Sequence, residues 1–331
     1  MGFYRLLLAV AVLAFHASEN QASGMLNGGV SVFCFFVISG FYIEMILSEK
    51  YSQEKIGSGY IRAFYLARFW RLYPIYITVA VAVIVASQFT PLLKIPGGLN
   101  FSAWGILVGV LNFSMMLLNV PSVNDLVIGP SWSIGVEVGF YAVAPFLLNK
   151  RLGLLLWLAA LTIILQFIPY GSHAPLLFAF PFFLAGALAR RYRRFIVHKL
   201  RLFMALPIWT LYGLAILMFV FPIPHAIYLG AADVHALNTL DLFFYPALTA
   251  VIVPILHERT KTNKADYLIG QLSYPFYIVH QPVIDLLGQF HNDFRIPTIL
   301  ILVTTLAATF TWLELTLIEP WRKRFAKVRA T

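Results

Sequence analysis

The chain has 331 residues, of which 60% are hydrophobic and only 11% are charged. An ordinary soluble domain carries about a quarter of its residues as charged side chains, so this composition excludes that class and predicts a polytopic membrane protein. The formal net charge is +10, but the basic residues gather between apolar segments. They therefore indicate membrane topology, and nucleic acid is not an expected partner. The one cysteine, Cys34, lies in an apolar run and is expected to pack in the interior.

Apolar segments of nearly membrane-crossing length, about 20 residues, follow one another along the whole chain. Arg5, the apolar stretch after it and the small residues of "ASENQASG" resemble a cleaved signal peptide. Because more apolar segments follow, we expect a retained transmembrane helix instead. We see no internal repeat and no soluble appendage, so residues 1–331 are predicted to form a single transmembrane domain. The expected segments are 2–17, 29–48, 70–89, 102–118, 132–148, 152–169, 175–189, 203–221, 240–257, 273–289 and 297–318.

The positive-inside rule tests this number of segments, because loops rich in Lys and Arg should face the cytoplasm. Loops 18–28 and 222–238 contain neither residue and are expected outside. The basic stretches at 50–71 and 150–151 should both be cytoplasmic, so the chain between them must cross the membrane an even number of times. Three apolar segments lie between them. One of 102–118 and 132–148 is therefore predicted not to cross. The predicted fold is all-α, with about ten transmembrane helices, one re-entrant or interfacial element and both termini cytoplasmic. The basic stretches are 50–71, 150–151, 190–201, 259–264 and the tail from Arg322.

Arg5 and His16 are eleven residues apart in the first segment, so on an α-helix their side chains fall on nearly the same face. An ionisable group inside a membrane helix needs a partner, a water-filled cavity or a function. A neutral imidazole at mid-membrane is suited to accept a hydroxyl proton as a general base. The alternative is a histidine bonded to a neighbouring carbonyl, with Arg5 as a topology anchor.

Two arginines, Arg68 and Arg71, lie three residues apart in "ARFWRLYP" at the predicted cytoplasmic end of a helix. Their planar guanidinium groups are suited to bind phosphate oxygens in pairs. They are equally suited to face lipid headgroups.

The segment "SWSIGVEVGFY", residues 131–141, carries Ser133, Glu137 and Tyr141 at intervals of four, which makes one polar stripe on a helix. Glu137 has no basic neighbour in sequence, and His16 is its natural partner in space. A hydrogen bond between helices is the structural alternative, but an intramembrane carboxyl is functional by default.

Three further features are less specific. His280 in "YPFYIVHQP" is predicted at a depth similar to His16, although a packed histidine is the simpler interpretation. Glu44 and Glu314 lie near segment ends, where they are expected to reach toward headgroups. Gly40, in "FFVISGF", permits a kink or a close helix approach.

These motifs together resemble the membrane-bound acyltransferase family 3, which O-acylates bacterial surface carbohydrates and some small molecules. The resemblance runs in order through Arg5-x10-His16, "FFVISGF", Arg68-x2-Arg71, the 131–141 stripe, "YPFYIVHQP" and "LIEPWRK". It implies a ten-helix core, an acyl-CoA donor from the cytoplasm, a central role for His16, and functional roles for the arginine pair and the stripe. Some relatives carry an additional hydrolase-like domain, which is not expected here.

The resemblance therefore predicts a transferase of the bacterial inner membrane that moves an acetyl group from acetyl-CoA to an exopolysaccharide or lipopolysaccharide unit. His16 and Glu137 are the expected catalytic residues. No metal or resident cofactor is expected, and membrane lipids complete the partners. A small-molecule or lipid acceptor is an alternative, and a proton-coupled transporter or flippase is a second, although no paired repeats support it. The expected substrate-binding residues are Arg5, Arg68, Arg71, Ser133, Tyr141 and His280.

Overall fold

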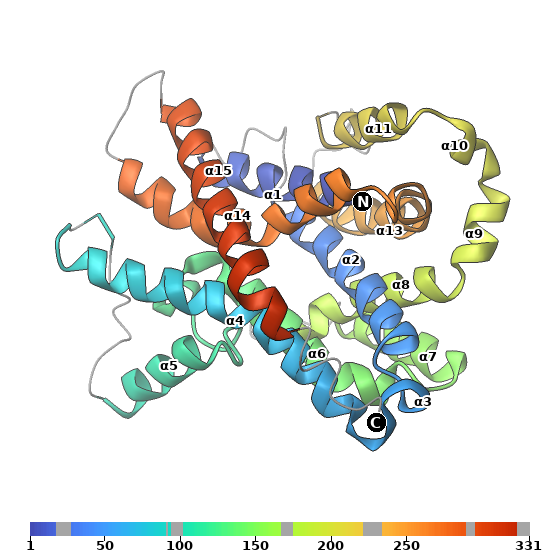
Figure 1. The fold of residues 1–331 in the computed structure, drawn as a ribbon, viewed down its shortest axis with the longest axis horizontal. Coiled ribbons are helices and arrows are strands. Elements are labelled where there is room, and N and C mark those ends of the chain that lie inside the picture. Colours follow the sequence, from blue (N-terminus) through green and yellow to red (C-terminus); the bar gives the residue numbers. More distant parts are fainter. Residues whose placement is uncertain are drawn as a thin grey trace. The chain divides into compact units, whose positions relative to one another are not determined.

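The computed structural model describes residues 1–17, 28–90, 92–93, 102–166, 175–220, 234–288 and 295–322. All secondary structure in these ranges is helical, and none of them contains a strand (Figure 1). The predicted all-α class is confirmed. The predicted outward loop 18–28 lies outside the described residues except for Gly28, and 222–238 lies outside them as far as residue 233, where α13 follows; the tail after Arg322 also lies outside them.

Each of the predicted apolar segments coincides with an α-helix. The ends differ most at α4, which begins ten residues earlier than expected and continues through Pro74, and at α5, which is shorter than predicted. The helices are α1 Gly2–Ala17, α2 Gly28–Glu49, α4 Tyr60–Ser87, α5 Ala103–Ser114, α6 Trp132–Leu147, α7 Leu152–Gln166, α8 Pro175–Arg191, α11 Ile208–Val220, α13 Val234–Thr260, α14 Lys264–Leu287 and α15 Arg295–Leu313. Short helices α3 Gln53–Ile56, α9 Arg193–Lys199 and α10 Arg201–Ala205 join some of them, and a π-helical turn, η4 Glu314–Ile318, follows α15.

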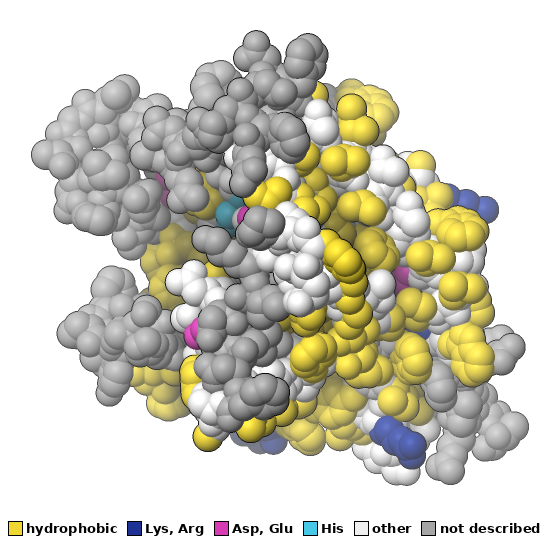
Figure 2. Space-filling model, turned by 90° about the vertical axis from the view of Figure 1, so that its left-hand side faces the viewer, with side chains coloured by type: hydrophobic (Ala, Val, Ile, Leu, Met, Phe, Trp, Pro, Cys, Tyr) yellow, Lys and Arg dark blue, Asp and Glu magenta, His cyan; other side chains and the backbone are white. Residues whose placement is uncertain are grey.

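Several helices have the length and composition of membrane spans. Within the described residues four do so, at Gly28–Glu49, Gln53–Ser87, Asp241–Thr260 and Ile296–Arg322. Large apolar side chains are exposed along α4, α5, α7 and α15, for example Phe69, Trp157 and Trp312. Figure 2 shows one face on which hydrophobic side chains cover much of the described surface and Lys or Arg side chains are few. Such a surface is expected to contact lipid rather than water.

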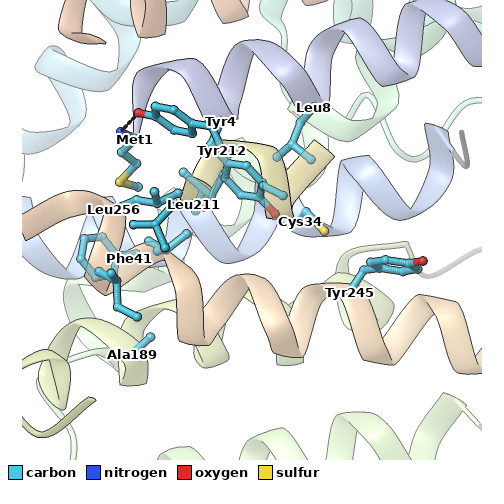
Figure 3. Close-up of a cluster of buried hydrophobic side chains, with 14 of the residues drawn as sticks. Met1, Tyr4, Leu8, Cys34, Phe41, Ala189, Leu211, Tyr212, Tyr245 and Leu256 are labelled. Atoms are coloured by element: carbon cyan, nitrogen blue, oxygen red, sulfur yellow. Dashed lines mark hydrogen bonds between the residues drawn. The ribbon is translucent and has the colours of Figure 1, made fainter. Parts of the chain in front are cut away.

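The chain divides into two compact units, each built from two separate stretches. The first comprises Met1–Glu44 and Phe182–Ser273. Its core packs residues of α1, α2, α11 and α13 together (Figure 3). Cys34 lies in this core, is a free thiol and is fully buried, as expected. Buried members of the core are Met1, Tyr4, Leu8, Val30, Cys34, Ile38, Phe41, Ala189, Leu211, Tyr212, Ala215, Tyr245, Val253, Ile255 and Leu256.

Two glycines let α2 and α8 cross at backbone contact in the first unit (Figure 1). A Cβ atom at Gly40 would overlap the carbonyl of Phe183, and one at Gly186 would overlap the carbonyl of Val37. Small residues allow membrane helices to approach this closely. Of the two roles predicted for Gly40, the close helix approach is confirmed.

The second unit comprises Met45–Pro181 and Tyr274–Thr331. In it α4 packs on α6, where the Tyr65 hydroxyl donates to the Ala142 carbonyl at 2.7 Å. Helix α5 has only 12 residues and is capped by Ser102, whose side chain accepts from the Gly105 N–H at 3.1 Å. At a rise of 1.5 Å per residue, α5 extends about 18 Å.

The chain after α5 turns back and lies along this same helix. The side chain of Asn112, 2% exposed, donates to the Asp125 carbonyl at 3.0 Å and accepts from the Val127 N–H at 2.9 Å. Further along, Leu118 passes so close to α6 that only glycine fits at position 135. Residues 102–131 therefore form a helix and a return segment.

Candidate active site

Arg5 and His16 both lie on the unbroken helix α1, in the first unit. The Arg5 guanidinium carbon stands 5.7 Å from the ring centroid of Tyr42, a cation–π distance. His16 Nδ1 is 3.1 Å from the Val12 carbonyl oxygen. A carbonyl only accepts, so Nδ1 carries a proton, and in the neutral imidazole Nε2 then carries the lone pair. The carbonyl-bonded histidine of the structural alternative is thus observed, in the tautomer that suits a base at Nε2.

Asp266 anchors the first turn of α1, a role that the sequence analysis missed. Its carboxylate accepts from the Gly2 N–H at 2.7 Å, from the Phe3 N–H at 3.0 Å and from the Tyr212 hydroxyl at 2.7 Å. The Met1 amine lies 2.7 Å from the same carboxylate. Burial alone would raise the pKa of Asp266, but these hydrogen bonds outweigh it and hold the pKa well below its ordinary value.

Asp266→Asn should lower the free energy of unfolding by about 1.5–3 kcal/mol, because it removes the charge from these hydrogen bonds. A carboxylate whose pKa is lowered by folding contributes its full stabilisation at pH values above its ordinary pKa. That stabilisation is lost as the pH falls from the ordinary pKa through the lowered one. The deficit of Asp266→Asn should therefore stay constant at neutral pH and shrink only below about pH 4. Thermal unfolding in detergent across pH measures this. An equal loss in Glu54→Gln, which removes an exposed carboxylate, would contradict it.

The predicted stripe on α6 exists, and its three side chains are hydrogen-bonded within the second unit. Ser133 Oγ lies 2.8 Å from the Tyr277 hydroxyl and donates to the Pro130 carbonyl at 3.0 Å. One turn further, the Tyr141 hydroxyl donates to a Glu137 carboxylate oxygen. Ser133 thus ties α6 to α14, and Tyr141 fixes the Glu137 carboxylate.

Glu137 and His16 belong to different units. Their pairing stays a prediction from the sequence.

Two tyrosines of "YPFYIVHQP" face the polar side chains of the second unit. The Tyr274 hydroxyl donates to the Leu72 carbonyl on α4 at 2.7 Å, and both Tyr274 and Tyr277 lie within electrostatic range of Glu137. His280 is fully buried, and its Nδ1 bonds the Tyr277 carbonyl at 2.6 Å. This contact is the one expected of a packed histidine, the simpler interpretation given above.

Arg68 and Arg71 lie on α4 within electrostatic range of each other. Arg68 also lies near Tyr141, and its Nε is buried with no hydrogen-bond partner among the described residues. Arg71 Nη1 is 3.1 Å from a carboxylate oxygen of Glu314. The second unit therefore gathers cationic side chains from α4 beside the polar stripe of α6.

A profile of the acyltransferase family 3, described as an acyltransferase domain, matches residues 3–313. The chain belongs to this family. The match runs from Phe3, in the first turn of α1, to the end of α15 and includes both units. An acyltransferase needs groups that hold a donor and groups that move a proton, and the predicted residues of both kinds lie within the matched range.

This acyltransferase is similar to two curated bacterial enzymes. The O-acetyltransferase OatA of Staphylococcus aureus is 27% identical over 344 aligned positions, which cover 93% of this chain and 55% of that protein. The peptidoglycan O-acetyltransferase OatA of Listeria monocytogenes is 33% identical over 147 positions, which cover 43% of this chain and 22% of that protein. The chain thus spans about half the length of the staphylococcal relative. No solved structure matches it.

Two carboxylates of this acyltransferase do not reach toward headgroups, and that prediction was wrong. Glu314 is 1% exposed and accepts from Arg71. Glu44 is 9% exposed and pairs with Arg191 Nε at 2.7 Å within the first unit. A carboxylate with a guanidinium in reach is better compensated by that partner than by a stretched side chain at the interface. The partners lie 147 and 243 positions away in sequence, so no local pattern indicates them.

Proposed function

We propose that this acyltransferase moves an acetyl group from cytoplasmic acetyl-CoA to a hydroxyl of a cell-surface glycan or its lipid-linked precursor. One observation carries the proposal: Arg68 and Arg71 stand beside the hydrogen-bonded Glu137–Tyr141 pair in one unit of an acyltransferase family 3 chain. Guanidinium groups suit the phosphates of CoA. Both relatives are named O-acetyltransferases, one of them for peptidoglycan, which supports a glycan acceptor.

The proposed chemistry assigns the proton to His16. Its Nε2 takes the acceptor hydroxyl proton while the hydroxyl oxygen forms an ester with the acetyl carbonyl. The carbon–sulfur bond breaks, and CoA leaves as a thiol after receiving the proton. Arg68 and Arg71 hold the CoA phosphates, and the Glu137 carboxylate fixed by Tyr141 is required for turnover. Arg5 and Ser133 serve the substrate site, and His280 supports it from α14.

The finer topology is also part of the proposal. We infer ten crossings in the bacterial inner membrane with both termini cytoplasmic, and we assign the non-crossing element to α5 and its return segment. The length of about 18 Å for α5 against a hydrocarbon core of about 30 Å supports this. So does Asn112, because non-helical backbone at membrane depth has to be buried in protein.

Purified protein in detergent should transfer labelled acetyl from acetyl-CoA, and Glu137→Gln should slow turnover while leaving acetyl-CoA affinity nearly unchanged. Glu54→Gln is the matched control, because Glu54 is exposed on α3. Proton NMR of surface glycans from deletion and parent strains identifies the acceptor. Glycans with identical acetylation in both strains would redirect the proposal to a small-molecule or lipid acceptor. Absence of any acetyl-CoA turnover would overturn the proposal.

A further inference from the structure

A third arginine lies with Arg68 and Arg71 in the second unit. Arg322, in "LIEPWRK", is the last described residue of the helix that continues α15. It lies within electrostatic range of Arg68, and its Nη1 is 3.6 Å from the Glu314 oxygen that also binds Arg71. Two guanidinium groups, from two helices, thus contact one buried carboxylate, and the guanidinium of Arg68 lies within electrostatic range of both arginines.

The π-helical turn η4 explains why Glu314 and Arg322 meet. They are eight residues apart, and in a regular α-helix eight residues rotate a side chain about 80° past two full turns. A π turn contains one additional residue. The eight residues therefore rotate about the helix axis only about as far as seven residues of a regular α-helix. This brings the side chain of position 322 back to the face of position 314. The same π turn buries Glu314 at its first position.

In the part of the chain that the structure describes, the three arginines of this cluster meet two paired carboxylates. Glu314 and Glu319 pair with Arg71 and Arg322. Among the described residues no carboxylate pairs with Arg68, and its buried Nε has no hydrogen-bond partner. A buried N–H donor of this kind is normally satisfied, so Arg68 fits an anionic ligand that brings its own oxygen atoms.

The anion that suits three planar guanidinium groups is a phosphate, or several phosphates on one molecule. We propose that Arg322 is a third phosphate-binding arginine of the donor site, and that Glu314 is a positioning residue that holds Arg71 and Arg322 side by side. The proposal rests on the proposed function, because it takes the phosphate groups of CoA as the ligand.

The test is calorimetry of CoA binding to the purified protein in detergent. Arg322→Gln and Arg68→Gln should each weaken binding roughly ten- to a hundredfold, as expected for losing a hydrogen bond to a charged group. Arg322→Lys keeps the charge but not the fork, so its loss should be intermediate. Arg151→Gln removes an exposed arginine of the same unit and should leave affinity unchanged. Arg71 is not substituted, because its contact with the buried Glu314, at 3.1 Å, is closer than the 3.6 Å contact of Arg322.

Glu314→Gln separates positioning from simple charge. Removing a negative charge beside an anion site should tighten CoA binding if only charge matters. If Glu314 positions the arginines, Glu314→Gln should weaken binding despite the added positive charge, and Glu314→Asp should recover part of it. Thermal unfolding of each variant with and without CoA identifies any that fail to fold, and Arg322→Lys then carries the test.

Two results separate the role of Arg322 from the existence of the donor site. If Arg68→Gln weakens CoA binding while Arg322→Gln behaves like Arg151→Gln, the role of Arg322 is refuted and the donor site stands. If the parent protein does not bind CoA, or if Arg68→Gln leaves its affinity unchanged, the proposed function itself loses its donor.

Discussion

His16→Asn should reduce acetyl transfer by at least a hundredfold, and His16→Ala should do the same. General base catalysis contributes roughly 10²- to 10⁴-fold to a rate, and neither side chain accepts a proton at neutral pH. The asparagine variant is the sharper one. Its amide N–H can donate to the Val12 carbonyl as His16 Nδ1 does, so the local hydrogen bond of α1 is kept while the lone pair of Nε2 is removed.

The control for this experiment is His198→Ala, which removes an exposed histidine of α9. Transfer of labelled acetyl is measured at saturating acetyl-CoA, alongside thermal unfolding. His198→Ala should retain parental activity. A well-folded His16→Asn protein with near-parental turnover would refute a proton-transfer role for His16 and leave its carbonyl-bonded contact as its whole function.

Gly40→Ala should destabilise the first unit strongly. The added methyl would occupy the position of the Phe183 carbonyl, so α2 and α8 have to move apart along their whole contact. Overpacking of this kind costs about 1–3 kcal/mol, and more where the obstacle is backbone. Gly186→Ala should behave alike, because its methyl meets the Val37 carbonyl.

The matched control is Gly213→Ala in α11, where a Cβ atom meets nothing within 4 Å. Alanine there should be neutral or should stabilise the helix by about 0.4–1 kcal/mol. Thermal unfolding in detergent compares the three variants. Equal midpoints for Gly40→Ala and Gly213→Ala would contradict the close approach of α2 and α8.

The helices of this chain are readable from its sequence because a lipid-exposed helix has to be apolar over most of its length. The polar stripe of α6 is readable for the same reason, since Ser133, Glu137 and Tyr141 stand out against that background. The close approach at Gly40 follows from the absence of a side chain. Each of these features depends on residues within one helix.

Pairings between distant segments could not be read in this way. The sequence predicts that Glu314 reaches toward the headgroups, because its partner Arg71 lies on another helix. Asp266 belongs to no conspicuous motif, although an acidic residue is common in the first turn of a helix. Tyr274 and Tyr277 stand out less than His280, because histidine is the more conspicuous chemical group. The spacing of the two tyrosines, three apart like Arg68 and Arg71, was the available signal.

Cys34 should give no background signal when introduced cysteines are labelled to map the membrane topology of this chain. Its thiol is fully buried in the core of the first unit, and a thiol without access to reagent is inert. The parent protein should therefore remain unlabelled by a membrane-impermeant maleimide, and any cysteine introduced elsewhere should report against zero background. Lys150→Cys and Met116→Cys, both at exposed positions, can then assign a membrane side to the C-terminal end of α6 and to the segment after α5, without any change to the packing around Cys34.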